Sequence, residues 1–153
     1  MKIFRKSALI ISALFLIFLS AGYLAAQGPG SRELVILFTH DLHSYFLPHS
    51  VLTEDGQSEE RGGFAKLAYI IKEQRIYHGN KAIRLDAGDF SMGTLFHTSF
   101  MNEASELLLM EQMGYDVTTF GNHDFDFGTA GLARMLSVAK AKGKTLPCIV
   151  ASN

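Results

Sequence analysis

The sequence predicts an α/β fold in which strands and helices alternate as βαβαβαβ around a mainly parallel sheet. Three observations support this prediction. Four short apolar runs of strand length recur along the chain, and apolar residues at helical spacing lie between them. Each of the first three runs ends abruptly in a polar cluster. Right-handed crossovers connect alternating strands and helices, and they place the strands parallel to one another in one sheet.

The first predicted elements are a strand, a long loop and a helix. Residues 34–38 form a continuous apolar run rich in branched side chains, as expected for a strand that is buried on both faces. Residues 44–63 have no periodicity and contain proline and glycine, so we expect a long loop there. The helix is indicated by apolar residues at helical spacing: Phe64, Leu67, Ala68 and Ile71.

Three strands and two helices are predicted in the remainder of the chain. The strands are residues 82–85, 116–120 and 147–151. A helix over residues 102–113 separates the first two of them, and Gly114 is a suitable C-terminal stop. The apolar face of the other helix is Leu132, Met135, Leu136 and Ala139. Cys148, the only cysteine, is expected to be a small buried side chain in the last strand.

The polar clusters at the strand ends are the candidate functional residues. Asp41 and His43 follow the first strand, Asp89 follows the second, and Asn122 and His123 follow the third. Ligands of parallel sheets bind beyond the carboxyl ends of the strands, so we expect these side chains to share one edge. The alternative for the third cluster is a polar turn that only caps the next helix.

This set of side chains suits a pair of metal ions. Carboxylate, imidazole and amide ligands without thiolates favour Mn, Zn, Fe, Co or Ca. Two such ions bind a phosphoryl oxygen and activate a bridging water for in-line attack. His123 would then stabilise charge on the phosphoryl or leaving oxygen, and Asp124 would orient its ring.

The motifs Asp41-x-His43, Gly88-Asp89 and Gly121-Asn122-His123-Asp124 resemble the first three signature blocks of the calcineurin-like metallophosphoesterases. Their surroundings resemble one branch more closely, the exported 5′-nucleotidases and 2′,3′-cyclic-nucleotide phosphodiesterases. Further matching segments are Gly62-Gly63-Phe64-Ala65-Lys66, Leu85-Asp86-Ala87 and Gly114-Tyr115-Asp116. The resemblance covers nearly all of residues 33–153.

This resemblance implies specific roles for the candidate residues. Asp41 and His43 are expected to bind one metal ion, Asp89 to bridge two ions, and Asn122 to bind the second. His123 is expected to be the catalytic histidine with Asp124 as its partner, and Asn122 and His123 are also expected to contact substrate. The sequence departs from the branch at two positions. His40 replaces the usual Asn and is an additional candidate ligand, and Asp124 stands where Glu is commoner.

The resemblance also implies the extent of the domain and its function. Residues 33–153 match the N-terminal half of a metallophosphoesterase α/β/β/α sandwich, whose further histidine ligands and nucleoside-binding domain come from later sequence. The expected activity is metal-dependent hydrolysis of a nucleotide phosphoester, and the expected partners are that substrate and the missing C-terminal half. The alternative is a truncated inactive remnant, or a half-domain that needs a second polypeptide.

The N-terminus predicts export. Basic residues at positions 2, 5 and 6 precede an apolar run over 8–19, which is the layout of a signal peptide over residues 1–26 with a linker over 27–32. An uncleaved inner-membrane anchor is the alternative, because residues 8–26 are long enough to span a bilayer. The predicted location is therefore periplasmic or secreted, with membrane contact only through this segment. A net charge of −1 argues against nucleic-acid binding, which needs a basic face.

Overall fold

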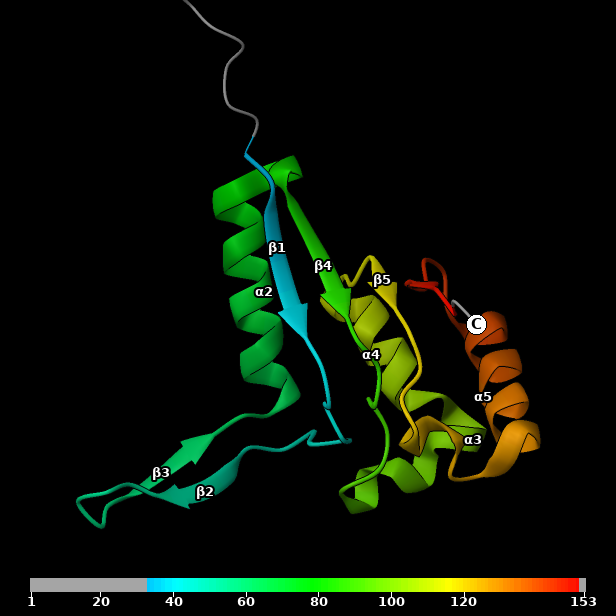
Figure 1. The fold of residues 1–153 in the computed structure, drawn as a ribbon, viewed down its shortest axis with the longest axis horizontal. Helices are drawn as coiled ribbons and strands as arrows, with labels where there is room; N and C mark the ends of the chain where they lie inside the picture. The colour runs from blue at the N-terminus through cyan, green and yellow to red at the C-terminus, as the bar shows by residue number, and fades with distance from the viewer. Residues whose placement is uncertain (1–32, 152–153) are drawn as a thin grey trace, which may run out of the picture. The chain divides into compact units, whose positions relative to one another are not determined.

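The structure, a computed structural model, describes residues 33–151 (Figure 1). The predicted signal peptide or anchor and the linker at residues 27–32 lie outside the described residues. Within residues 33–151, none of the helices has the length and apolar character needed to cross a bilayer.

A four-stranded parallel sheet organises the described residues. Its strands, in spatial order, are β1 (Val35–Thr39), β4 (Ala82–Asp86), β5 (Val117–Thr118) and β6 (Cys148–Ile149). Thr39 pairs with Asp86 and Leu85 pairs with Val117, so the carboxyl ends of the first three strands lie side by side. The predicted parallel sheet is confirmed.

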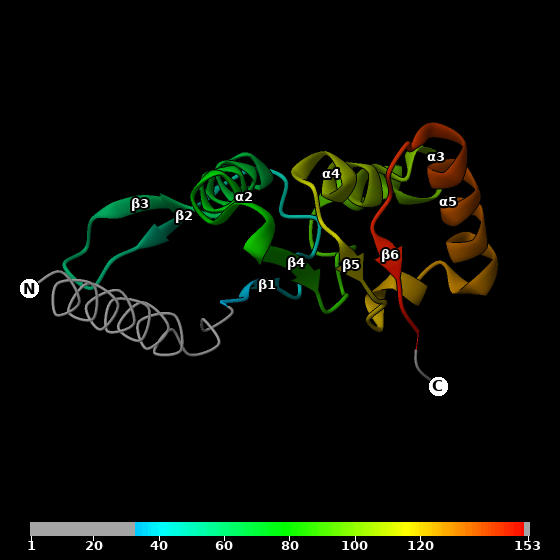
Figure 2. The same cartoon turned by 90° about the horizontal axis from the view of Figure 1, so that it is seen from above.

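Helices connect the parallel strands. The α-helices are α2 (Phe64–His78), α3 (Phe100–Glu103), α4 (Ser105–Met113) and α5 (Gly128–Lys142). Short 3₁₀ turns are η1 (Gly79–Lys81), η2 (Leu95–Ser99) and η3 (His123–Phe125). The strands occupy the sheet in sequence order, so each right-handed crossover moves in the same direction and returns its helix to the same face. Figure 2 shows α2 and α4 together on one side of the sheet.

The core lies between this layer of helices and the sheet. Its fully buried apolar residues are Phe90, Phe100, Ala104, Leu107, Met110, Met135 and Ala139. The opposite face of β1 is open, because Ile36 is 55% exposed and Phe38 is 60% exposed. The prediction that this strand is buried on both faces is therefore wrong for the described residues. Because the crossovers all run in the same direction, the helices of the described residues pack on the other face of the sheet.

Three further local predictions are corrected. The expected loop at 44–63 contains an antiparallel hairpin formed by β2 (His49–Leu52) and β3 (Ser58–Arg61). These strands are largely exposed and lack the apolar alternation by which a half-buried strand is recognised. The expected helix at 102–113 is interrupted at Ala104, whose φ of 52° ends α3 before α4 begins. Cys148 is exposed, because β6 is the edge strand of the described sheet.

Candidate active site

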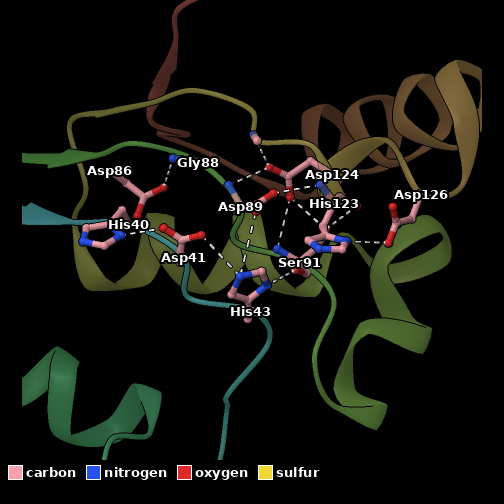
Figure 3. A network of polar contacts seen from close by, with 11 residues as sticks. His40, Asp41, His43, Asp86, Gly88, Asp89, Ser91, His123, Asp124 and Asp126 are labelled. Atoms are coloured by element: carbon pink, nitrogen blue, oxygen red, sulfur yellow. Dashed lines mark hydrogen bonds and ion pairs between the residues drawn. The ribbon is translucent and has the colours of Figure 1, made fainter.

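The candidate side chains lie on three loops that leave β1, β4 and β5 at the same edge of the sheet (Figure 3). Backbone hydrogen bonds join the first two loops: Asp41 N donates to Gly88 O at 3.0 Å, and His43 N donates to Asp89 O at 3.1 Å. A Cβ atom added to Gly88 would lie 2.6 Å from Gly121 N, so the second and third loops touch through their backbones. The three loops therefore form one interlocked unit.

Several candidate residues have strained backbones. Asp41, His43 and Asp89 have φ values of 52°, 47° and 58°, in the left-handed region that favours glycine. Each such non-glycine residue costs about 1–3 kcal/mol, and such residues persist where the surrounding structure fixes them and often where function needs them. Three of them meet at this edge of the sheet.

Asp41, His43 and Asp89 bring their ligand atoms together. His43 Nε2 lies 3.3 Å from Asp41 Oδ1 and 3.9 Å from Asp89 Oδ2, and the three ligand atoms lie within 4.8 Å of one another. The other ring nitrogen, Nδ1, is 3.3 Å from the Ser91 carbonyl oxygen. A proton on Nδ1 satisfies that carbonyl and leaves the Nε2 lone pair facing two carboxylate oxygens. This donor set fits a divalent cation.

The amide of Asn122 lies against the same cluster, 3.3 Å from Asp89 Oδ2. With its nitrogen toward Asp89, the amide donates a hydrogen bond to the carboxylate. With its oxygen toward Asp89, two oxygen atoms face each other without a proton, and a bound cation resolves that contact. Asn122 thus lies against the Asp89 carboxylate, beside the group formed by Asp41, His43 and Asp89.

His123 contacts a different carboxylate from the one predicted. Its Nδ1 lies 2.9 Å from Asp126 Oδ2, and this hydrogen bond raises the pKa of the imidazole. The predicted contact with Asp124 is wrong, because the two side chains leave η3 in different directions. Asp126 was overlooked, although an i,i+3 spacing brings side chains together in a 3₁₀ turn. The His123 ring also packs edge-on against His43, with ring centroids 5.4 Å apart.

Asp124 is fully buried between the loops. Its Oδ2 accepts hydrogen bonds from Asp89 N at 3.0 Å and Gly121 N at 2.9 Å. Its Oδ1 accepts from Ser91 N at 3.0 Å and Ser91 Oγ at 2.8 Å. Burial raises the pKa of this carboxyl group, and the four hydrogen bonds oppose that shift. The carboxylate holds the β4 and β5 loops together.

Two further side chains complete the surroundings. His40 is exposed, and its Nδ1 lies 2.5 Å from Asp41 Oδ2, the oxygen turned away from His43. This hydrogen bond lowers the pKa of Asp41. Asp86, for which no site role was predicted, accepts from Thr39 Oγ1 at 2.6 Å and from Thr118 Oγ1 at 3.0 Å. It ties the ends of β1, β4 and β5 together below the site.

Similarity to known proteins identifies the family of this chain. No protein-family model matches the chain. A probable 5′-nucleotidase of Treponema pallidum is 38% identical over 112 residues, which are 70% of this chain and 18% of that protein. The NAD 5′-nucleotidase of Haemophilus influenzae is 32% identical over 146 residues, which are 92% of this chain and 24% of that protein. The chain belongs to the 5′-nucleotidase type of calcineurin-like phosphoesterases.

Solved structures of the 5′-nucleotidase type share this fold. The Haemophilus influenzae NAD nucleotidase superposes with a TM-score of 0.66 and 31% sequence identity, covering 78% of this chain and 20% of that one. The 5′-nucleotidase precursor from Thermus thermophilus superposes with a TM-score of 0.63 and 26% identity, covering 78% and 22%. These matches confirm the predicted α/β class. The chain spans only 18% to 24% of the length of the two sequence relatives.

Proposed function

We propose that this chain is the N-terminal part of the catalytic domain of an exported, metal-dependent phosphoester hydrolase that acts on nucleotides. The observation that carries the proposal is the convergence of Asp41, His43 and Asp89 ligand atoms within 4.8 Å at the carboxyl edge of the sheet. The similarity to proteins named 5′-nucleotidase supports nucleotide phosphoesters as the substrate class.

Each side chain has a distinct part in the proposed site. Asp41 and His43 would hold one divalent cation, Asp89 would be shared, and Asn122 would hold the second. When bound, two such cations supply Lewis acidity and lower the pKa of a water molecule that attacks phosphorus. The hydrogen bond of His43 to Ser91 O fixes the ring so that Nε2 faces the carboxylates.

His123 is the proposed acid that contacts substrate. The hydrogen bond between Nδ1 and Asp126 raises the pKa of the ring, which favours its protonated form. The opposite nitrogen, Nε2, then carries a proton for the phosphoryl or leaving oxygen. Asp126 takes the orienting role that the sequence assigned to Asp124. Asn122 and His123 remain the proposed substrate contacts.

The proposal also covers the chain outside the described residues. We place an export signal at 1–26, with an uncleaved anchor as the alternative, a linker at 27–32 and a partial phosphoesterase domain at 33–153. The protein would then act in the periplasm or outside the cell, and a C-terminal half would complete the site. Strained ligand residues each cost about 1–3 kcal/mol, so an intact cluster of them favours an enzyme over an inactive remnant.

The test is phosphoesterase activity with added Mn²⁺ on bis-p-nitrophenyl phosphate and on AMP. The chain alone and the chain extended through its downstream reading frame are compared, each with a matched Asp89→Asn variant. We expect activity in the extended form and its loss in the variant, because Asp89 is the ligand that both cations would share. Equal activity in Asp89→Asn, or no activity and no bound Mn²⁺ in either form, would refute the proposal.

A further inference from the structure

Ser44, the residue after His43, forms hydrogen bonds through its amide, its carbonyl and its hydroxyl group. It is fully buried, and its φ of 52° is left-handed like that of His43. Its backbone N donates to Phe90 O at 3.0 Å, and its carbonyl accepts from Thr94 Oγ1 at 2.5 Å. Its hydroxyl donates to Glu106 Oε1 at 2.8 Å. Ser44 therefore ties the β1 loop both to the β4 loop and to helix α4.

Glu106 is an unexpected residue for its position. It lies in the first turn of α4, is 0% exposed, and belongs to the same buried surface as Leu107 and Met110. Its Oε1 accepts from Ser44, and no described residue forms a hydrogen bond with its Oε2. A buried carboxyl group with one bonded oxygen costs more free energy than an apolar side chain of similar size. Packing of α4 alone does not account for it.

We propose that Glu106 is a positioning residue for the metal site, acting through Ser44 on His43. This inference rests on the proposed function, because His43 is one of the proposed ligands. Glu106 does not touch the ligand cluster, so its effect passes through the backbone of the two adjacent left-handed residues.

The physical basis is the cost of the left-handed conformation. Positive φ values are unfavourable for side chains other than glycine, so the loop through His43 and Ser44 needs anchors on both sides. The hydrogen bond from His43 N to Asp89 O anchors one side, and the bond from Ser44 Oγ to Glu106 anchors the other. Without the acceptor on α4, the loop relaxes and the His43 ring turns away from the carboxylates.

The experiment measures Mn²⁺ affinity directly, from the electron paramagnetic resonance signal of free Mn²⁺ during titration of the chain extended through its downstream reading frame. Glu106→Leu removes the acceptor but keeps an apolar side chain of similar length. We expect it to weaken Mn²⁺ binding by about 10-fold or more, the usual effect of removing an outer partner of a metal ligand. Glu106→Gln keeps an acceptor oxygen, and its affinity should stay within about 3-fold of the parent.

A double-mutant cycle tests the route through Ser44. Ser44→Ala should weaken Mn²⁺ binding as much as Glu106→Leu, and the double variant should show no additional loss, because both remove one shared contact. Met110→Ala is the matched control: it lies on the same helix and is fully buried, and its side chain has no oxygen that could accept the Ser44 hydrogen bond. It should lower the melting temperature and leave Mn²⁺ affinity unchanged.

The outcomes are distinguishable. Parent-like Mn²⁺ affinity in Glu106→Leu overturns the positioning role, even if that variant is less stable, and leaves the proposed hydrolase intact. If Glu106→Leu does not fold, Ser44→Ala is compared with Glu106→Gln. Weakened Mn²⁺ affinity in Ser44→Ala together with retained affinity in Glu106→Gln supports the inference, and equal affinities in the two variants overturn it. Absence of Mn²⁺ binding in the parent chain overturns both this inference and the proposed function.

Discussion

Replacing Asp124 should destabilise the protein strongly, because its carboxylate is the shared acceptor of the β4 and β5 loops. Asp124→Ala leaves three backbone amides, two of them in buried hydrogen bonds, and one hydroxyl without this acceptor. Each unsatisfied donor costs about 1–3 kcal/mol, so the three amides alone amount to about 3–9 kcal/mol. Water entering the space left by the side chain restores part of this, and we expect a loss of about 3 kcal/mol. That is a large fraction of the roughly 5–15 kcal/mol that stabilises a typical domain.

Urea unfolding followed by circular dichroism measures this loss. Asp124→Asn keeps one acceptor oxygen and turns an amide group toward two donors, so we expect about half the effect, near 1.5 kcal/mol. A loss below about 0.5 kcal/mol in Asp124→Ala would show that water satisfies these donors and that the carboxylate does not organise the loops. A variant with parent stability but a strongly reduced kcat would instead restore the catalytic role first assigned to Asp124.

Three more outcomes are expected. Gly121→Ala should abolish Mn²⁺ binding in the electron paramagnetic resonance titration, because the added Cβ would overlap the Asp89 carboxylate. Unchanged Mn²⁺ affinity would mean that the loop after β5 shifts freely. Asp126→Asn should lower kcat and move the alkaline limb of the pH–rate profile to lower pH, because the bond that raises the pKa of His123 is lost; an unmoved limb would contradict this pairing. Asp116 has a pKa lowered by its bidentate arginine partner, so its stabilising effect is present above the unfolded pKa of about 3.9 and is lost as pH falls through the lower folded value. Asp116→Asn should therefore flatten the acid limb of the curve of unfolding free energy against pH, measured by urea unfolding. An unchanged slope would show that this ion pair does not contribute to acid stability.

Sequence patterns predicted the framework of the molecule because that framework depends on local signals. The four strand-length apolar runs and the polar residues after them indicate a parallel sheet and the edge on which Asp41, Asp89 and Asn122 meet. The β2–β3 hairpin escaped prediction because exposed strands show no alternation of apolar residues. The two faces of β1 could not be distinguished, because a uniform apolar run does not reveal which side a helix covers.

The partners of the site residues were harder to predict. Asp124 and Asp126 are both carboxylates near His123 in sequence, and only the 3₁₀ geometry of η3 decides which one reaches the ring. Glu106 gave no signal, because an acidic residue in the first turn of a helix is ordinarily an exposed partner of the helix dipole. Its burial depends on the β1 loop lying over α4, a contact between residues that are 62 positions apart.

The order of the strands also governs when the site forms during folding. The proposed ligands lie on three chain segments, and the β4–β5 pairing that brings the last segment in rests on one registered pair, Leu85 with Val117. The full set of proposed ligands, Asn122 included, therefore comes together only when β1, β4 and β5 have paired. A cation that binds such a late structure slows unfolding and leaves the folding rate almost unchanged. Metal supply in the compartment would then set how long the native fold lasts once formed, and not how fast it is reached.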